Sequence, residues 1–157
     1  MKPNKPGIIR LNFQENYLET YSIVREAFSS VPDNISTYTY LATRRVQHQK
    51  MLKNTQVFGI NDSNGKLVGF TQYVIDSDDT AKLEWLGISP KEQKSPHRYG
   101  TALLNGSIDI LSKETGIKLI KAVSTATAKD FYIKNGFQQL QHTKFENQDY
   151  CFLSRTL

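Results

Sequence analysis

The sequence contains one cysteine, Cys151, and three histidines among its 157 residues. One cysteine cannot form an internal disulfide or a thiolate metal cluster. His48, His97 and His142 do not have the spacing of metal ligands. We therefore expect no metal site, a small buried side chain at Cys151, and the reducing, cytoplasmic setting in which disulfides are rare.

Long hydrophobic runs are also missing. No apolar stretch approaches the roughly 20 residues of a membrane-spanning helix, and the polar residues 1–6 precede no apolar segment, so no signal peptide is expected. No internal repeat or linker divides the chain. The length predicts one domain over residues 1–157, which at this size buries about two thirds of its unfolded surface without a disulfide or metal.

Several enzyme signatures are absent as well. The chain has neither the GxxxxGK[ST] loop of nucleotide-binding enzymes nor the GxGxxG fingerprint of dinucleotide-binding domains. Ser89 and Ser124 do not lie in a nucleophile-elbow sequence.

Charge is unevenly distributed, although the net charge is only +5. Residues 61–90 carry two lysines against five acidic residues, and residues 91–121 carry six Lys or Arg against three acidic residues. Such a division suggests a site that meets an anion on one side and a cation on the other. The alternative is ordinary solvated surface charge.

The apolar periodicity predicts alternating helices and strands. The expected elements are a strand over 7–12, helices over 14–29 and 37–53, antiparallel strands over 56–60, 66–75 and 81–89, a helix over 99–114, a strand over 117–123, a short helix over 125–135, and strands around 137–142 and 150–157. Asn64-Gly65 predicts a tight hairpin turn because both residues tolerate positive φ, and Gly136 is expected to cap the short helix.

This order predicts an α/β fold with a mixed, mostly antiparallel central sheet flanked by helices. The step from Ala81 to Val123 is expected to be a right-handed parallel strand–helix–strand crossover.

The loop before the long helix is the most informative segment. A strand ending in Trp85-Leu-Gly-Ile-Ser-Pro leads through a polar loop into a helix that starts near Gly100. A helix N-terminus presents unpaired N–H groups and partial positive charge, which suit phosphate. Gly100 lets the backbone approach a ligand, Ala102 keeps the first turn slim, and the loop adds positive side chains: Lys91, Lys94, His97 and Arg98. Taken alone, this is also how many α/β proteins begin a helix.

Two motifs give the segment a family resemblance. His97-x-x-Gly100-x-Ala102 resembles the [Gln/Arg]-x-x-Gly-x-[Gly/Ala] signature of the GCN5-related N-acetyltransferase (GNAT) family, with His97 in place of the usual Gln or Arg and a somewhat longer preceding loop. Ala128-x-x-x-Tyr132-x-x-x-Gly136-Phe137 resembles that family's second signature, with Thr125 where the family has an upstream asparagine. The motifs cover about residues 81–137, and the order of elements extends the likeness to most of the chain.

The resemblance implies acetyl-CoA as co-substrate, held at two places. The backbone of Arg98, Tyr99, Gly100, Thr101 and Ala102, together with His97, would hold the CoA pyrophosphate. Leu86, Gly87 and Ile88 would pair with the pantetheine arm and polarise the thioester carbonyl.

The implied reaction is direct attack of a primary amine on the thioester in a ternary complex. An alkylammonium with a pKa of about 10.4 must lose a proton before it attacks. Glu84 is the candidate base, with a solvent-facing strand charge as the alternative. Because residues two apart share a face of a strand, Lys82, Glu84, Leu86 and Ile88 are expected to point together, and Gly87 could permit a bulge. By resemblance, Tyr132 is the candidate acid toward sulfur, with a core aromatic as the alternative.

Other functions stay open at this stage. The basic stretch 43–50 could bind nucleic acid, the chain could bind acyl-CoA without catalysis, or it could act as a toxin on aminoacyl-tRNA. The acceptor is expected to be a small-molecule or peptide amine, preferably cationic, because Asp76, Asp78, Asp79 and Glu84 are expected near its entry. No membrane partner is expected, and a homodimer is compatible with the sequence.

Overall fold

The computed structural model describes residues 7–11, 22–23, 26, 54–145 and 148–157. Of the helix expected over 14–29, only Ser22, Ile23 and Glu26 are described, and these three are helical. The rest of that helix, and the whole helix expected over 37–53, lie outside the described residues.

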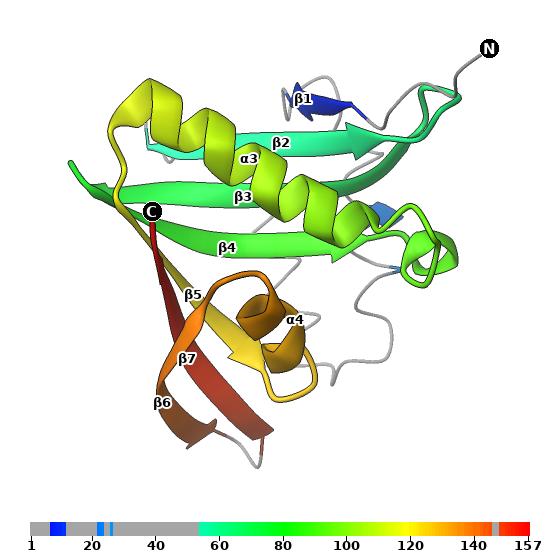
Figure 1. Cartoon of the computed structure of the whole chain (residues 1–157). Coiled ribbons are helices and arrows are strands. Elements are labelled where there is room, and N and C mark those ends of the chain that lie inside the picture. Colours follow the sequence, from blue (N-terminus) through cyan, green and yellow to red (C-terminus); the bar gives the residue numbers. More distant parts are fainter. Residues whose placement is uncertain (1–6, 12–21, 24–25, 27–53, 146–147) are drawn as a thin grey trace.

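The described part of the chain forms one mixed sheet of seven strands (Figure 1). In chain order the strands are β1 (Ile8–Arg10), β2 (Thr55–Asn61), β3 (Leu67–Ser77), β4 (Thr80–Ile88), β5 (Leu119–Thr125), β6 (Gln138–Phe145) and β7 (Gln148–Thr156). Their order across the sheet is β1-β2-β3-β4-β5-β7-β6. Only β4 and β5 pair in parallel, and every other described pairing is antiparallel. The fold class expected from the sequence is confirmed.

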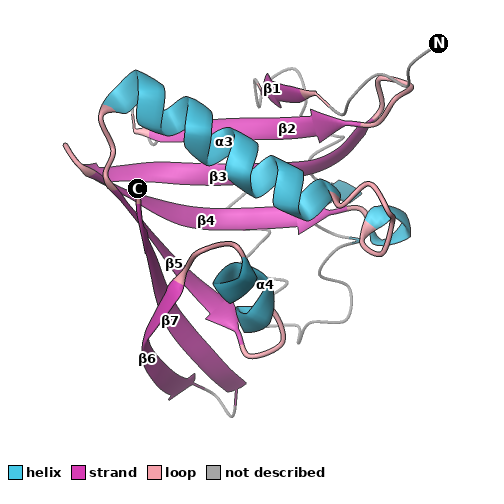
Figure 2. Ribbon diagram, in the orientation of Figure 1, coloured by secondary structure: helices cyan, strands magenta, loops and turns pink. Residues whose placement is uncertain are grey.

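After β4, three described helical segments connect the strands (Figure 2). A 3₁₀ turn, η1 (Pro90–Glu92), follows β4 and leads to the long helix α3 (Tyr99–Thr115), and α4 (Lys129–Lys134) connects β5 to β6. The short helix is narrower than the expected 125–135. No described helix is long and apolar enough to cross a membrane.

The two faces of the sheet carry separate apolar clusters, because neighbouring residues on a strand point to opposite faces. Phe58 of β2 belongs to the cluster beneath α3, which buries Leu103, Leu104, Ile108 and Leu111. The adjacent Val57 belongs to a second cluster on the other face: Leu11, Ile23, Val57, Leu67 and Phe70. Ile23 thus lies on the face opposite α3.

The turn between β2 and β3 differs in detail from the one expected. Gly65 has φ +81°, but Asn64 does not have a positive φ. The Asp62 carboxylate instead accepts the backbone N–H groups of Asn64 and Lys66, each at 2.9 Å. A side-chain acceptor stabilises the turn, so only its last residue needs the left-handed conformation.

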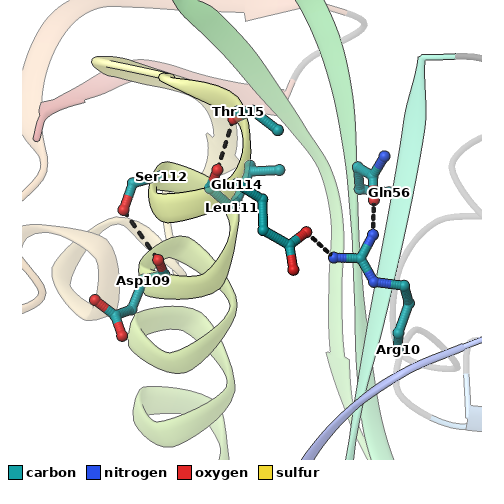
Figure 3. Close-up of polar contacts among 7 residues, drawn as sticks. All are labelled: Arg10, Gln56, Asp109, Leu111, Ser112, Glu114 and Thr115. Atoms are coloured by element: carbon teal, nitrogen blue, oxygen red, sulfur yellow. Dashed lines mark hydrogen bonds and ion pairs between the residues drawn. The ribbon is translucent and has the colours of Figure 1, made fainter.

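The C-terminal end of α3 is tied to the first two strands (Figure 3). The guanidinium of Arg10 in β1 donates hydrogen bonds to Gln56 in β2 and Glu114 in α3. The helix then ends at Gly116, whose φ of +69° closes it as a C-cap. These contacts hold one end of α3, and the opposite end carries the candidate site.

Candidate active site

The parallel pairing of β4 with β5 covers only part of each strand. Residues 80–83 are aligned with residues 119–122, ending with Leu83 opposite Ala122. Beyond that pair the strands diverge (Figure 1), and β4 pairs with β3 alone over its remaining length. The backbone of Leu86, Gly87 and Ile88 therefore lies where the edge of β4 that faces β5 has no strand paired to it.

A β-bulge interrupts β4 at the same level. Trp85 is aligned with Gln72 of β3, whereas Leu83 is aligned with the next residue, Tyr73, so Glu84 is the extra residue. The bulge is at Glu84, and the sequence-based placement at Gly87 is wrong. A bulge shifts the alternation of side chains by one position.

That shift also overturns the expected grouping on β4. Leu86 and Ile88 pack with Leu83 in the cluster beneath α3, whereas the Lys82 side chain is 51% exposed and Trp85 packs against the cluster on the other face. The prediction that Lys82, Glu84, Leu86 and Ile88 point together is therefore wrong. The expected alternation of side chains along β4 would have required a pairing with β3 that no bulge interrupts.

Glu84 is partly buried at the point where the strands part. Its side chain is 24% exposed, and its Oε1 lies 3.6 Å from Nζ of Lys82. The adjacent carbonyl of Trp85 accepts a 2.7 Å hydrogen bond from the buried hydroxyl of Thr71, which holds the bulge against β3. The carboxylate is therefore partly open to solvent.

The N-terminal turn of α3 lies just beyond the end of β4 and has free donors. The first bond of the helix runs from the N–H of Ala102 to the carbonyl of Arg98 at 3.1 Å. Within the described structure, no acceptor faces the N–H groups of Tyr99, Gly100 and Thr101. Orphan donors and a helix dipole are the features that an anion-binding turn requires.

Arg98 gives this turn its shape. It is the N-cap and has φ 52° and ψ 50°, the left-handed conformation that a non-glycine residue adopts at a cost. Ser95 supports it, because its carbonyl accepts the Arg98 N–H at 3.2 Å and its hydroxyl accepts the His97 N–H at 3.1 Å. Gln93 anchors the loop by donating to the carbonyl of Ile88 at 3.0 Å. The sequence analysis identified neither Ser95 nor Gln93.

His97 packs against the first residue of α3. Its ring lies 5.3 Å from that of Tyr99, whose side chain is buried. The other basic side chains of the loop, Lys91, Lys94 and Arg98, are exposed.

Gly100 brings the start of α3 close to α4. A Cβ at this position would lie 3.4 Å from Cε2 of Phe131 and 3.7 Å from Cγ1 of Ile88. The absence of a side chain therefore lets the anion-binding turn, the end of β4 and α4 meet at one place.

Tyr132 of α4 belongs to the core beside this junction. It is 8% exposed, and its ring makes edge-to-face contacts with Phe131 and Phe137 at 5.3 and 5.4 Å. Burial, and secondarily the nearby Tyr73, raise the pKa of Tyr132 above its ordinary value. With this raised pKa the hydroxyl stays protonated. No hydrogen-bond partner for it is found among the described residues, so it is available as a donor.

Tyr73 is a second buried tyrosine, and sequence reasoning missed it. Its hydroxyl is 2.8 Å from that of Ser107 in α3, and burial raises its pKa to about 12. Nothing in the local sequence distinguishes Tyr73 from other strand aromatics, and only the packing of α3 over β3 shows its polar contact.

The acidic turn lies away from this junction. Asp76 is near the end of β3, and Asp78 and Asp79 form the turn into β4, at the opposite end of β4 from Gly100. Asp79 accepts hydrogen bonds from Ser77 and Thr80, which lower its pKa, and its carbonyl accepts the N–H groups of residues 118 and 119. Asp79 thus shapes the turn, and only Glu84 of the four acids lies where the strands part.

Two further expectations concern metal and cysteine. The described residues contain no group of three His, Cys, Asp or Glu side chains that could hold a metal ion. His142 instead lies 3.2 Å from Asp149 across β6 and β7. Cys151 is buried, as expected.

Comparison with known proteins identifies the family. Residues 53–139 match the family model described as an acetyltransferase (GNAT) domain. The comparison with curated proteins gives no match.

Solved structures of similar fold include three acetyltransferases. PaiA N-acetyltransferase from Thermoplasma acidophilum, in complex with coenzyme A, is 19% identical with TM-score 0.71, covering 98% of this chain and 100% of the other. Spermidine N-acetyltransferase from Vibrio cholerae, in complex with CoA and spermine, is 14% identical with TM-score 0.71 and coverage of 97% and 95%. The ribosomal-protein-S18-alanine N-acetyltransferase from Escherichia coli is 21% identical with TM-score 0.73 and coverage of 96% and 93%. At these sequence identities the similarity shows that the fold is shared and nothing more specific.

Proposed function

Because this chain belongs to the GNAT acetyltransferase family and is an N-acetyltransferase, we propose that it transfers an acetyl group from acetyl-CoA to a primary amine by direct attack in a ternary complex. The observation that carries the proposal is the end of the β4–β5 pairing after Leu83 and Ala122. In this proposal the unpaired edge of β4 and the free N–H groups at the start of α3 bind the co-substrate, and the hydroxyl of the buried Tyr132 faces the gap.

The co-substrate fits these residues chemically. The N–H groups of Tyr99, Gly100 and Thr101, with Ala102 completing the turn, would bind the pyrophosphate, and the exposed charge of Arg98 and the loop lysines would add attraction. The backbone of residues 86–88 offers hydrogen bonds to an extended chain with amide groups, as an edge strand does. Acetyl-CoA bound there supplies the activated acyl group.

Glu84 is proposed to take the proton that the acceptor amine must lose, directly or through one water. An alkylammonium, with a pKa of about 10.4, has no free lone pair at neutral pH. The carboxylate lies at the bulge, next to the strand segment that would hold the thioester. Attack then forms the C–N bond, and a backbone N–H of β4 is proposed to stabilise the oxyanion.

Tyr132 is proposed to act on the departing sulfur. As the C–S bond breaks, its hydroxyl donates a hydrogen bond to the thiolate and supplies a proton. A tyrosine is neutral at physiological pH already at its ordinary pKa of about 10, and burial raises the pKa of Tyr132 further, so the donor is present throughout the working range. Burial also disfavours a lasting tyrosinate, so solvent must return the proton promptly.

A cationic amine is the proposed acceptor class. Glu84 places a negative charge at the junction, and the solved spermidine N-acetyltransferase of similar fold was crystallised with spermine. Asp76, Asp78 and Asp79 are too far along β4 to contact the reacting amine, so they would act only through their longer-range field. The same site chemistry also suits a peptide amine.

The test combines binding with turnover. Acetyl-CoA should raise the melting temperature, since at a hundredfold excess over its Kd a ligand of the native state adds about 2.7 kcal/mol. Polyamines, lysine peptides, neutral amines and amino acids should then be compared at low and high salt. Cationic acceptors should react faster, with kcat/KM falling as salt rises. No melting shift at millimolar acetyl-CoA would contradict the co-substrate, and faster reaction of neutral acceptors would contradict the acceptor class.

Three broader features belong to the same proposal. We propose that residues 1–157 form one domain, that the protein works in the reducing cytoplasm, where a lone buried Cys151 stays a thiol, and that nucleic acid and membranes are not its partners. The basic stretch that suggested nucleic acid lies outside the described residues.

A further inference from the structure

Four hydrogen bonds join β7, α3 and α4 through three side chains: Asn105, Asn135 and Arg155. Nη1 of Arg155 donates to Oδ1 of Asn105 at 2.7 Å. Nδ2 of Asn105 donates to the carbonyl of Thr101 at 3.1 Å and to Oδ1 of Asn135 at 2.9 Å. Nδ2 of Asn135 then donates to the carbonyl of Phe131 at 2.8 Å.

The chemistry of the groups fixes which atom donates and which accepts in each of these hydrogen bonds. A guanidinium can only donate, so it requires the oxygen of the Asn105 amide to face it. The Asn105 nitrogen then faces the two carbonyl oxygens, and the Asn135 nitrogen must face Phe131. Reversing either amide would place like groups together. The charged donor at the start also makes the first bond a strong one.

Gly136 makes the route of Arg155 available. A Cβ at this glycine would lie 3.4 Å from Nε and 3.6 Å from Cδ of Arg155. The arginine side chain therefore passes over the glycine that ends α4 and reaches α3. Gly136 also has φ +90°, a backbone conformation that by itself favours glycine at this position.

Both ends of this series of hydrogen bonds lie in elements that carry proposed site residues. One end is the carbonyl of Thr101, in the first turn of α3. The other is the carbonyl of Phe131, one residue before Tyr132. Because α4 has only six residues, it is too short to be stable without tertiary contacts, so side-chain bonds of this kind decide where it lies.

We propose that Asn105, Asn135 and Arg155 are positioning residues that hold α4, and with it Tyr132, at a fixed distance from the anion-binding turn of α3. This inference rests on the proposed function, since these residues would set the distance between Tyr132 and the turn that is proposed to bind the pyrophosphate. Asn105 is the central residue, because it forms hydrogen bonds with Thr101, Asn135 and Arg155.

The first test does not depend on catalysis. Amide hydrogen exchange over residues 129–136 should become at least about fivefold faster in Asn135→Ala and Asn105→Ala, as expected for the loss of a partly buried hydrogen bond. Lys134→Ala, an exposed position on the same helix, and Ser112→Ala on α3 are the matched controls and should not change it. Arg155→Lys, which keeps a charged donor, should retain more protection than Arg155→Ala.

The second test separates positioning from general destabilisation. Asn135→Ala should weaken CoA binding about fivefold to tenfold, yet leave unchanged the binding of ADP, which carries a pyrophosphate without a pantetheine arm. A merely unstable protein would lose both ligands together. In turnover, a loss of up to about 100-fold in kcat is expected from misplacement of Tyr132, and it should be absent when Asn135→Ala is made in Tyr132→Phe.

The outcomes distinguish the two proposals. If the wild-type protein fails to bind CoA, the proposed function is wrong, while the exchange result still decides whether the network holds α4. If exchange over 129–136 and the CoA-to-ADP affinity ratio both stay at wild-type values in Asn135→Ala and Asn105→Ala, the network does not position α4 and this inference is overturned.

Discussion

Leu83 in β4 lies opposite Ala122 in β5, and this is the last aligned pair of the parallel ladder. The bulge at the next residue, Glu84, shifts the alternation of side chains by one position, so that Leu86 and Ile88 pack beneath α3 together with Leu83. The end of the ladder, the carboxylate and the exposed edge of β4 are therefore consequences of one local irregularity.

Glu84→Gln should lower kcat by about 10²–10⁴, the usual contribution of a general base, with the Kd of acetyl-CoA unchanged. The remaining rate should rise with pH toward the pKa of the acceptor amine, because more of the amine is then already deprotonated. Asp78→Asn, at an exposed carboxylate in the distant turn, is the control and should keep wild-type turnover. Equal rates for Glu84→Gln and wild type would assign Glu84 to the strand surface.

Tyr132→Phe should lower kcat by about 10²–10⁴ and leave acetyl-CoA binding nearly unchanged. The variant should fold at least as stably as wild type, because the hydroxyl has no hydrogen-bond partner among the described residues and its removal relieves the desolvation of a polar group. Tyr73→Phe gives the contrast: it loses the bond to Ser107 at a cost of about 1 kcal/mol and keeps turnover. Normal turnover in Tyr132→Phe would make this tyrosine a core residue only.

Gly100→Val should remove the stabilisation by acetyl-CoA. Its Cβ falls 3.4 Å from Phe131, and the added methyl groups press on Phe131 and Ile88, so the turn of α3 must move from α4. Gly100→Ala should have an intermediate effect, because a single methyl group fits at that distance. Gly7→Val, where a Cβ meets no atom within 4 Å, is the control. Thermal melts with and without acetyl-CoA give both the apo stability and the ligand shift; an undiminished shift in Gly100→Val would contradict the role of the turn.

Alkali should unfold the protein through its buried tyrosines. The folded-state pKa of Tyr73 is about 12, against an ordinary value of 10.0, so the unfolded state releases this proton first. The corresponding stabilisation is complete below pH 10 and is lost as pH rises through 12, amounting to about 2–3 kcal/mol over this window. Tyr132 acts in the same direction. Chemical denaturation at pH 9–11 should show a smaller decline in Tyr73→Phe than in wild type; identical slopes would show that Tyr73 ionises without unfolding.

The sequence by itself determined the order of elements and the two motifs at Gly100 and Tyr132. These are local properties: apolar periodicity fixes whether a segment is helix or strand, and a glycine at a helix start or end is visible in the chain. The family follows from the same segments, because the match to the family model spans residues 53–139.

Only the tertiary structure decided which groups meet. The bulge at Glu84 depends on the register with β3, which is set by packing on both faces and not by the residues of β4 alone. The support of Arg98 by Ser95, the bond between Tyr73 and Ser107, and the chain from Arg155 to Phe131 all join residues through a particular backbone path. No local pattern predicts such contacts, because in the unfolded chain each of these groups forms hydrogen bonds with water, and only the fold replaces water by a particular protein partner.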